Sequence, residues 1–237
     1  MNELERLRLK VRPLLHFSAP GDALYVYYAF YHDPRRTRLY VHEDADGHAD
    51  GFAAVCQTGK RLFQPTVALR TPDAEAAAEI LHQALVSGRP YHVVTTPDLR
   101  DAVAEAIDIT QSETDHVYQL DLSHFQPFIN VLVVAEQGLE DRPRFVIRSQ
   151  GEIAAESGLN WYSPHFVEIF VRATVAARER GWGRAVLAAC TTWASRSARQ
   201  PLYFANERDE HSLTLAKEVG YVDTGARKFA SEGICQS

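Results

Sequence analysis

The sequence predicts an α/β protein with mixed sheets, built from two similar halves. The main observation is an order of strands and helices that occurs twice along the 237 residues. The segment RTRLYVH at 36–42 resembles RPRFVIR at 142–148 position by position, and the same elements follow each of them. Self-similarity at a fixed offset indicates a repeated architecture. The chain is also longer than one average domain and long enough for two packed halves.

Composition narrows the class of protein. Hydrophobic residues make up 46% of the chain and charged residues 24%, as in globular proteins. No run approaches the roughly 20 apolar residues of a membrane helix, and the net charge of −6 argues against a nucleic-acid binder. The three cysteines are far apart and the ten histidines lack ligand spacing, so we expect no disulfide and no metal site. The simplest expectation is a cytoplasmic protein.

The C-terminal half is predicted to follow the order β, β, β, α, β, α, β. Runs rich in β-branched and aromatic residues indicate the strands, and apolar residues at helical spacing indicate the helices. Gly220 is a stop signal for the second helix. The expected strands are 144–149, 152–162, 165–175, 202–206 and 221–229, and the expected helices are 183–198 and 209–219.

The N-terminal half repeats this order. Residues 1–15 alternate charges with leucines, which predicts an amphipathic helix before the first strand rather than a leader peptide. The expected strands are 36–42, 50–58, 63–71, 91–96 and 116–122, and the expected helices are 71–85 and 97–107. We interpret the pattern as a duplication, with domains at 1–125 and 126–237 joined through 123–143. One irregular α/β sheet with accidental similarity is the alternative.

The segment RERGWG at 178–183 is the motif that points to chemistry. It contains two glycines at the predicted start of a helix and follows a long strand. Backbone N–H groups at such a helix start bind phosphate oxygens, aided by the helix dipole, and arginines add positive charge. A Walker A loop and a dinucleotide fingerprint are both excluded, because their lysine or third glycine is missing. A tight turn with solvating arginines is the alternative.

At this point the sequence resembles the GNAT superfamily of acetyl-CoA-dependent N-acetyltransferases, whose pyrophosphate loop has the pattern Q/R-x-x-G-x-G/A. The resemblance covers roughly 142–229, and the distal family signature is partly matched by Ser212, Leu215, Gly220 and Tyr221. The corresponding turn of the N-terminal half, RTPDAEAA, has no glycine. The resemblance therefore implies two GNAT-like units in tandem, of which only the C-terminal one binds acetyl-CoA.

The resemblance also implies residues that contact acetyl-CoA. In this family the fourth and fifth strands splay apart, which leaves backbone groups for the pantetheine arm. Asn206 matches a position that often contacts the cosubstrate, although it could instead cap the next helix. The implied acetyl-CoA-binding residues are Ala173, Thr174, Val175, Arg178, Glu179, Arg180, Gly181, Trp182, Gly183, Arg184, Asn206 and Ser212.

The family pattern leaves the catalytic groups less well defined. Many members have a tyrosine as general acid at the position of Ala216, so this chain departs from the pattern, and Tyr221 and Ser212 are weak replacements. Glu168 is the candidate base, because it is the carboxylate of the predicted fourth strand, where some members of the family keep a glutamate as base, and burial facing a cleft would raise its pKa. It stands about one residue from the family position, which a bulge could correct. His165 is a weaker candidate.

The expected activity is transfer of an acetyl group from acetyl-CoA to a primary amine of a small molecule. Asn160, Trp161 and Tyr162 are the candidate acceptor-binding residues, with an interface role for the aromatics as the alternative. Cys190 is expected in the core. A non-catalytic acyl-CoA-binding module is the rival function, and a dimerising or substrate-gating role of the N-terminal half, with a homodimer, stays open because fold alone does not decide function.

Overall fold

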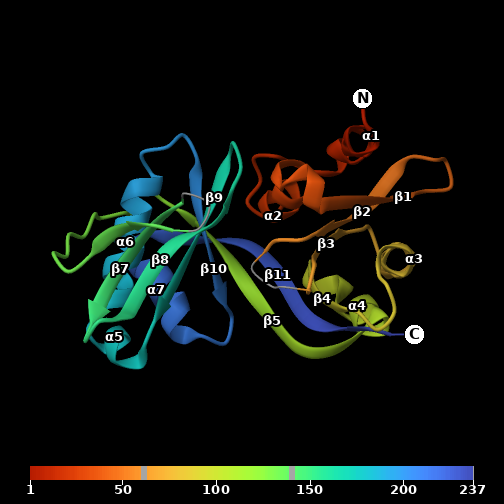
Figure 1. Ribbon diagram of the computed structural model, residues 1–237. Helices are drawn as coiled ribbons and strands as arrows, with labels where there is room; N and C mark the ends of the chain where they lie inside the picture. Colours follow the sequence, from red (N-terminus) through yellow and green to blue (C-terminus); the bar gives the residue numbers. More distant parts are fainter. Residues whose placement is uncertain (60–62, 139–141, 237) are drawn as a thin grey trace. The chain divides into compact units, whose positions relative to one another are not determined.

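The computed structural model describes residues 1–59, 63–138 and 142–236. Its contacts divide the chain into two compact units, and Figure 1 shows the elements of each. Unit 1 comprises Met1–Asp115 and Arg227–Ser237, and unit 2 comprises His116–Ala226. Within the described ranges, no helix has the length and apolar character needed to span a membrane.

Unit 1 is a sheet with helices on both of its faces. Helices α1 and α2 cover one face, and α3 and α4 cover the other, where they enclose an apolar core (Figure 1). Local capping sets two of the helix starts, because Asn2 and Glu5 form a capping box at α1 and Asp73 caps α3. The helices are α1 (Glu3–Val11), α2 (Ala23–Val26), α3 (Ala74–Ala84) and α4 (Arg100–Ala106), and the strands lying wholly in unit 1 are β1 (Thr37–Glu43), β2 (Ala49–Cys56), β3 (Thr66–Arg70) and β4 (Pro90–Thr95).

Unit 2 has the same order of strands and helices, with its helices packed in a single core. Its first three long strands are antiparallel neighbours, and the next strand runs parallel to the third. Helices α6 and α7 bury their apolar faces in one core with the strands. The strands are β6 (Val134–Gln137), β7 (Pro143–Ser149), β8 (Glu152–Tyr162), β9 (Phe166–Ala173) and β10 (Gln200–Asn206), and the helices are α5 (Val175–Glu179), α6 (Trp182–Ala194) and α7 (Glu210–Val219).

Both halves therefore show the predicted order of elements with the same strand directions. In the first half the β1–β2 and β2–β3 pairs are antiparallel and the β3–β4 pair is parallel. In the second half the β7–β8 and β8–β9 pairs are antiparallel and the β9–β10 pair is parallel. The order of elements is confirmed, and the origin of the halves by duplication stays a prediction.

The two remaining strands, β5 (Ile107–Leu120) and β11 (Tyr221–Cys235), contribute to both units. The strand order runs β4-β11-β5-β10, so the closing strand of each half lies beside a strand of the other. Residues 229–234 of β11 pair antiparallel with β4. The compact units consequently divide the chain differently from the predicted domains at 1–125 and 126–237, and those domain boundaries stay a prediction.

Several local expectations need correction. The predicted strand 165–175 ends at Ala173, because the Thr174 hydroxyl accepts from the Ala177 amide at 3.3 Å and caps α5, which begins at Val175. Strand β5 begins at Ile107 rather than at 116, and α2 and β6 were not expected. Residues 139–141 of the predicted linker lie outside the described residues.

Candidate active site

The glycine motif forms the start of α6. Gly181 is the N-cap residue in the left-handed conformation, with φ of 68°, and the first backbone bond of the helix runs from the Ala185 amide to the Gly181 carbonyl at 3.2 Å. The amides of the first turn have no partner inside a helix. Within the described residues no side chain caps this end, and a Cβ at Gly181 would meet no other atom within 4 Å. The helix start is therefore open to an anion.

Three arginines surround this helix start, and all are exposed. The Arg180 guanidinium lies 5.0 Å from the ring centre of Trp182, and that of Arg184 lies 5.6 Å from the ring centre of Phe128. These contacts hold the cations next to the first turn of α6. The predicted acetyl-CoA-binding residues from Arg178 to Arg184 thus lie together, and Glu179 is the one acidic side chain among them.

The second glycine brings α6 close to the strand and to α7. Gly183 is buried, and a Cβ there would lie 3.7 Å from the Ala173 Cβ and 3.9 Å from Leu215 Cδ2. An alanine would make ordinary contacts at these distances, but a longer side chain would push the helix away. Gly183 therefore holds the start of α6 against the end of β9.

Strands β9 and β10 separate halfway along β9. Their pairing runs from Phe166↔Gln200 to Ile169↔Tyr203 and ends there, whereas β8 pairs with β9 as far as Ala173. Residues 170–173 therefore pair on one side alone among the described strands. The predicted splay is present, but its free edge lies at 170–173 and not at Thr174 and Val175, which belong to the next helix.

The direction of the backbone groups along this edge follows from one hydrogen bond. The Thr174 amide donates to Ala154 O at 2.9 Å, so Thr174 faces β8. Backbone groups alternate sides along a strand, which directs those of Val171 and Ala173 toward the β10 side. Arg178 Nε donates to the Ala173 carbonyl at 3.2 Å. The edge thus presents the Val171 N–H and C=O and the Ala173 N–H.

The candidate base Glu168 lies on β9, on the sheet face away from α6, because its neighbours Val167 and Ile169 are in the helix-side core. Its side chain is buried with 8% exposed. Asn160 Nδ2 donates to Glu168 Oε1 at 2.7 Å. The register of β8 shifts between Leu159 and Trp161, opposite Glu168. This bulge lies on β8 and does not shift Glu168 along β9, whose pairing with β10 is regular from Phe166 to Ile169, so the one-residue offset from the family position stays.

The three candidate acceptor-binding residues separate into two groups. Asn160 and Trp161 lie with Glu168, since Trp161 is its cross-strand partner and is 2% exposed. Tyr162 is 46% exposed and pairs with Val167. Its ring lies 4.8 Å from the Arg199 guanidinium and 5.6 Å from that of Arg142. The structure therefore brings Asn160 and Trp161, but not Tyr162, to the glutamate.

Asn206 ends β10 and Ser212 lies in the first turn of α7, as the sequence predicts. Asp209, not Asn206, caps α7, because its carboxylate accepts from the Ser212 amide at 3.1 Å. Asn206 accepts from the Arg208 amide at 2.9 Å in the turn after β10. The Ser212 hydroxyl lies 2.8 Å from the Tyr203 hydroxyl. Both predicted contact residues are thus next to the end of β10, where the splay opens.

Neither Ala216 nor Tyr221 places an accessible hydroxyl at the position of the expected acid. Ala216 is fully buried. Tyr221 is buried in the same core, where its hydroxyl lies 2.9 Å from the Thr191 hydroxyl, and burial raises the pKa of Tyr221 far above its usual value. Cys190 is in this core as expected, and burial raises the pKa of its thiol to about 12.

Sequence reasoning missed two residues on the face of Glu168. Phe170 and Arg172 follow Glu168 at steps of two along β9, so all three side chains point away from α6. The period of two in the strand could have identified them.

In the other unit, the described residues contain one group of side chains suited to a metal ion, the exposed Asp44, Asp46 and His48 of the β1–β2 turn.

Comparison with known proteins identifies the fold. No protein-family model matches the chain, and no curated protein matches it by sequence. A Drosophila protein of known structure shares 13% identity over 99% of this chain and 97% of its own, with a TM-score of 0.68. A GCN5-related N-acetyltransferase from Kribbella flavida shares 13% identity over 90% and 93%, with a TM-score of 0.60. A GCN5-related N-acetyltransferase-like protein from Streptococcus suis shares 14% identity over 90% of this chain and 98% of its own, with a TM-score of 0.58. The chain has the GNAT fold.

Proposed function

We propose that the protein is an N-acetyltransferase that transfers an acetyl group from acetyl-CoA to the primary amine of a small molecule. The proposal is supported by two features of unit 2 that lie next to each other. A strand edge left open beyond Ile169 leads to an uncapped, arginine-rich helix start at Gly181. This is the arrangement that a long molecule with an extended amide-containing arm and a pyrophosphate needs.

The residues present suit a CoA thioester. The first-turn amides of α6 and the arginines at 178, 180 and 184 would hold the pyrophosphate, because helix dipole and charge act together there. The Val171 and Ala173 backbone groups would pair with the amides of the pantetheine arm. The space around the Cβ position of Gly181 is empty within 4 Å, which leaves room for the pyrophosphate. Acetyl-CoA supplies the activated acetyl group.

Glu168 is the group that we propose as base. It would accept the proton from the acceptor's ammonium, directly or through one water molecule. Asn160 fixes one carboxylate oxygen at 2.7 Å, and the buried Trp161 lies beside it and limits access of water. Binding the amine next to the thioester supplies a large part of the rate by proximity.

Ala216 has no hydroxyl and Tyr221 is buried, so neither residue can protonate the thiolate of CoA when it leaves. We propose that water protonates it. The same observation favours a second candidate function, a module that binds an acyl-CoA without turning it over. The two functions differ in turnover and not in binding.

The test is calorimetric binding of acetyl-CoA, followed by a thiol-detection screen for CoA release with a panel of primary amines. We expect binding, and release of CoA with at least one amine. Binding without release across a broad panel would favour the non-catalytic module. Absence of acetyl-CoA binding would overturn both functions.

A pair of glycine variants tests the location of the site. Gly181→Glu places a carboxylate at the helix start, and we expect it to abolish acetyl-CoA binding. Gly88→Glu is the matched control, because Gly88 also has a positive φ of 75° and open space around its Cβ position. Both variants carry the strain of roughly 1–2 kcal/mol of a left-handed residue. Equal binding by the two variants would place the pyrophosphate elsewhere.

A further inference from the structure

Three side chains form a row along the face of β9 that points away from α6. They are Glu168, Phe170 and Arg172, and their exposure rises in this order from buried to exposed. Alternate residues of a strand are spaced by about 6.6 Å, so the row spans about 13 Å between its first and last Cα atoms. An acid, an aromatic ring and a cation thus follow one another beside the strand edge that is open to β10.

The ring of Phe170 is positioned by its contact with Gly158 on β8. Gly158 is its cross-strand partner on β8, and a Cβ at Gly158 would lie 3.0 Å from Phe170 Cε1 and 3.2 Å from Cζ. The missing side chain therefore lets the ring lie against the backbone of β8. The Arg172 guanidinium in turn lies 5.2 Å from the ring centre. This contact positions the cation, since guanidinium groups stack on aromatic faces.

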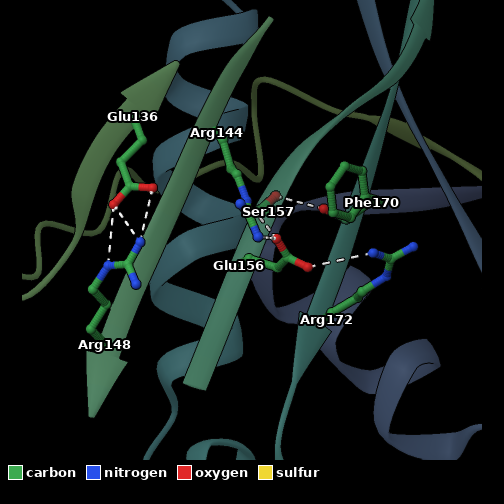
Figure 2. A network of polar contacts seen from close by, with 7 residues as sticks. All are labelled: Glu136, Arg144, Arg148, Glu156, Ser157, Phe170 and Arg172. Atoms are coloured by element: carbon green, nitrogen blue, oxygen red, sulfur yellow. Dashed lines mark hydrogen bonds and ion pairs between the residues drawn. The ribbon is translucent and has the colours of Figure 1, made fainter. Parts of the chain in front are cut away.

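The charge of Arg172 is only partly balanced by a carboxylate, and its guanidinium is largely exposed to solvent. Its Nη1 lies 3.5 Å from Glu156 Oε1, at the long end of a hydrogen bond. Glu156 Oε2 instead accepts from Arg144 Nε at 2.6 Å, and Arg144 Nη2 also contacts this oxygen. Figure 2 shows Arg144, Glu156 and Arg172 in front of the sheet, with a helix behind it. Two arginines share one carboxylate, and the Arg172 side chain is 77% exposed.

Arg148 shows how a fully paired arginine differs in this sheet. It is on β7, and its Nη2 lies 3.0 Å and 3.3 Å from the two carboxylate oxygens of Glu136 (Figure 2). Its charge is balanced by its partner in a two-oxygen contact. Arg172 lacks such a contact among the described residues and retains the planar fork that matches a carboxylate.

We propose that the acceptor carries a carboxylate as well as its primary amine, and that Arg172 binds the carboxylate while the amine lies at Glu168. The inference rests on the proposed function and adds the class of substrate, amino acids. Phe170 lies between the two charged groups and contacts the carbon chain that joins amine and carboxylate. Arg172 is then a specificity residue that touches the substrate but takes no part in proton transfer.

The experiment compares ω-amino acids with their primary amides, because the two members of a pair have the same chain and amines of similar basicity. The measured quantities are kcat/KM for 4-aminobutyrate and 6-aminohexanoate and for their amides, and the KM for acetyl-CoA. In the wild type we expect at least one acid to exceed its amide about tenfold or more. Arg172→Gln should lower kcat/KM for that acid about ten- to hundredfold, the range of a charged hydrogen bond, and leave the amide unchanged.

Two further variants make the comparison specific. Arg172→Lys keeps the charge but loses the fork, so its effect should fall between the wild type and Arg172→Gln. Arg148→Gln removes the same charge from the same sheet and should change neither acid nor amide. Thermal melting checks that each variant folds. Equal use of acid and amide by the wild type, an equal loss for both on Arg172→Gln, or a raised KM for acetyl-CoA would overturn the inference.

Failure of the proposed function gives a different result. If no amine releases CoA, binding of the same acid and amide pairs to the protein with acetyl-CoA is measured by calorimetry. Tighter binding of an acid than of its amide, lost in Arg172→Gln, would support the carboxylate site without catalysis. Equal binding of acid and amide would overturn it.

Discussion

Asn160 on β8 donates a hydrogen bond of 2.7 Å to Glu168 on β9, at the point where the register of β8 shifts. The bulge brings Trp161 opposite the glutamate, and the amide of Asn160 holds one carboxylate oxygen. Two strands thus fix an acidic side chain that is 8% exposed. The open edge of β9 begins two residues further on, which places the carboxylate at the inner end of the proposed acetyl-CoA site.

Glu168→Gln tests the role of this carboxylate. Glutamine keeps the shape but does not accept the ammonium proton, so we expect kcat to fall by about 10²- to 10⁴-fold near neutral pH. The loss should shrink as the pH rises toward the pKa of the acceptor amine, because more of the amine is then deprotonated in solution. The measurement is kcat against pH. Glu152→Gln, at an exposed position of β8, is the control, and an unchanged kcat for Glu168→Gln would exclude Glu168 as base.

Tyr221→Phe separates a structural tyrosine from an acid catalyst. The Tyr221 and Thr191 hydroxyls lie 2.9 Å apart in the core of unit 2, and burial raises the pKa of Tyr221. Removing one partner of a buried hydrogen bond costs roughly 1–3 kcal/mol. We expect that loss of stability in urea unfolding, with kcat unchanged. Thr191→Val should destabilise to a similar extent, and a large fall in kcat for Tyr221→Phe alone would contradict the structural role.

The repeated order of strands and helices could be predicted because most of its elements carry a local signal, whereas α2 and β6 were missed. Gly220 ends α7 in the left-handed conformation, as expected of a helix stop. The end of β9 could not be placed in this way, because the β-branched run HFVEIFVRATV continues through Thr174 and Val175 while the Thr174 side chain caps a helix. Composition reports strand propensity, whereas the cap depends on the turn that follows.

Contacts between strands that are distant in the sequence could not be predicted either. The position of Glu168 opposite Trp161 depends on a bulge in another strand, and the placement of β11 beside β4 depends on pairing across the whole chain. Neither leaves a local pattern. The motif from Arg178 to Gly183 was readable because its glycines and arginines act within one turn.

His42 predicts a pH dependence of stability. Its Nδ1 lies 2.5 Å from Asp50 and its Nε2 lies 3.3 Å from Glu79, and the hydrogen bond to Asp50 is the main cause of the raised pKa of His42. A raised pKa in the folded state stabilises the protein fully below the unfolded pKa of about 6.5, and this contribution is lost as the pH rises through the folded pKa.

We therefore expect the melting temperature of the wild type, relative to His42→Gln, to fall as the pH rises above about 6.5. The measurement is thermal unfolding of both proteins across this range. His48→Gln is the control, since the His48 side chain is 81% exposed and 3.8 Å from Asp44. A difference between wild type and His42→Gln that does not change with pH would contradict the charged contact.

Gly233→Ala tests the placement of the end of β11 in unit 1. Gly233 pairs with Tyr91 of β4, and a Cβ there would clash with the Asp108 carbonyl oxygen and lie 2.8 Å from its carbon. Both atoms belong to the backbone of β5, which is held nearby by the bond from the Thr110 hydroxyl to the Glu232 carbonyl at 3.1 Å. The strands must separate to admit a methyl group, so we expect a loss of about 1–3 kcal/mol or more in urea unfolding. The neighbouring Ile234 is 47% exposed, and Ile234→Ala should cost much less. Equal stability of the two variants would show that β11 does not pass so close to β5.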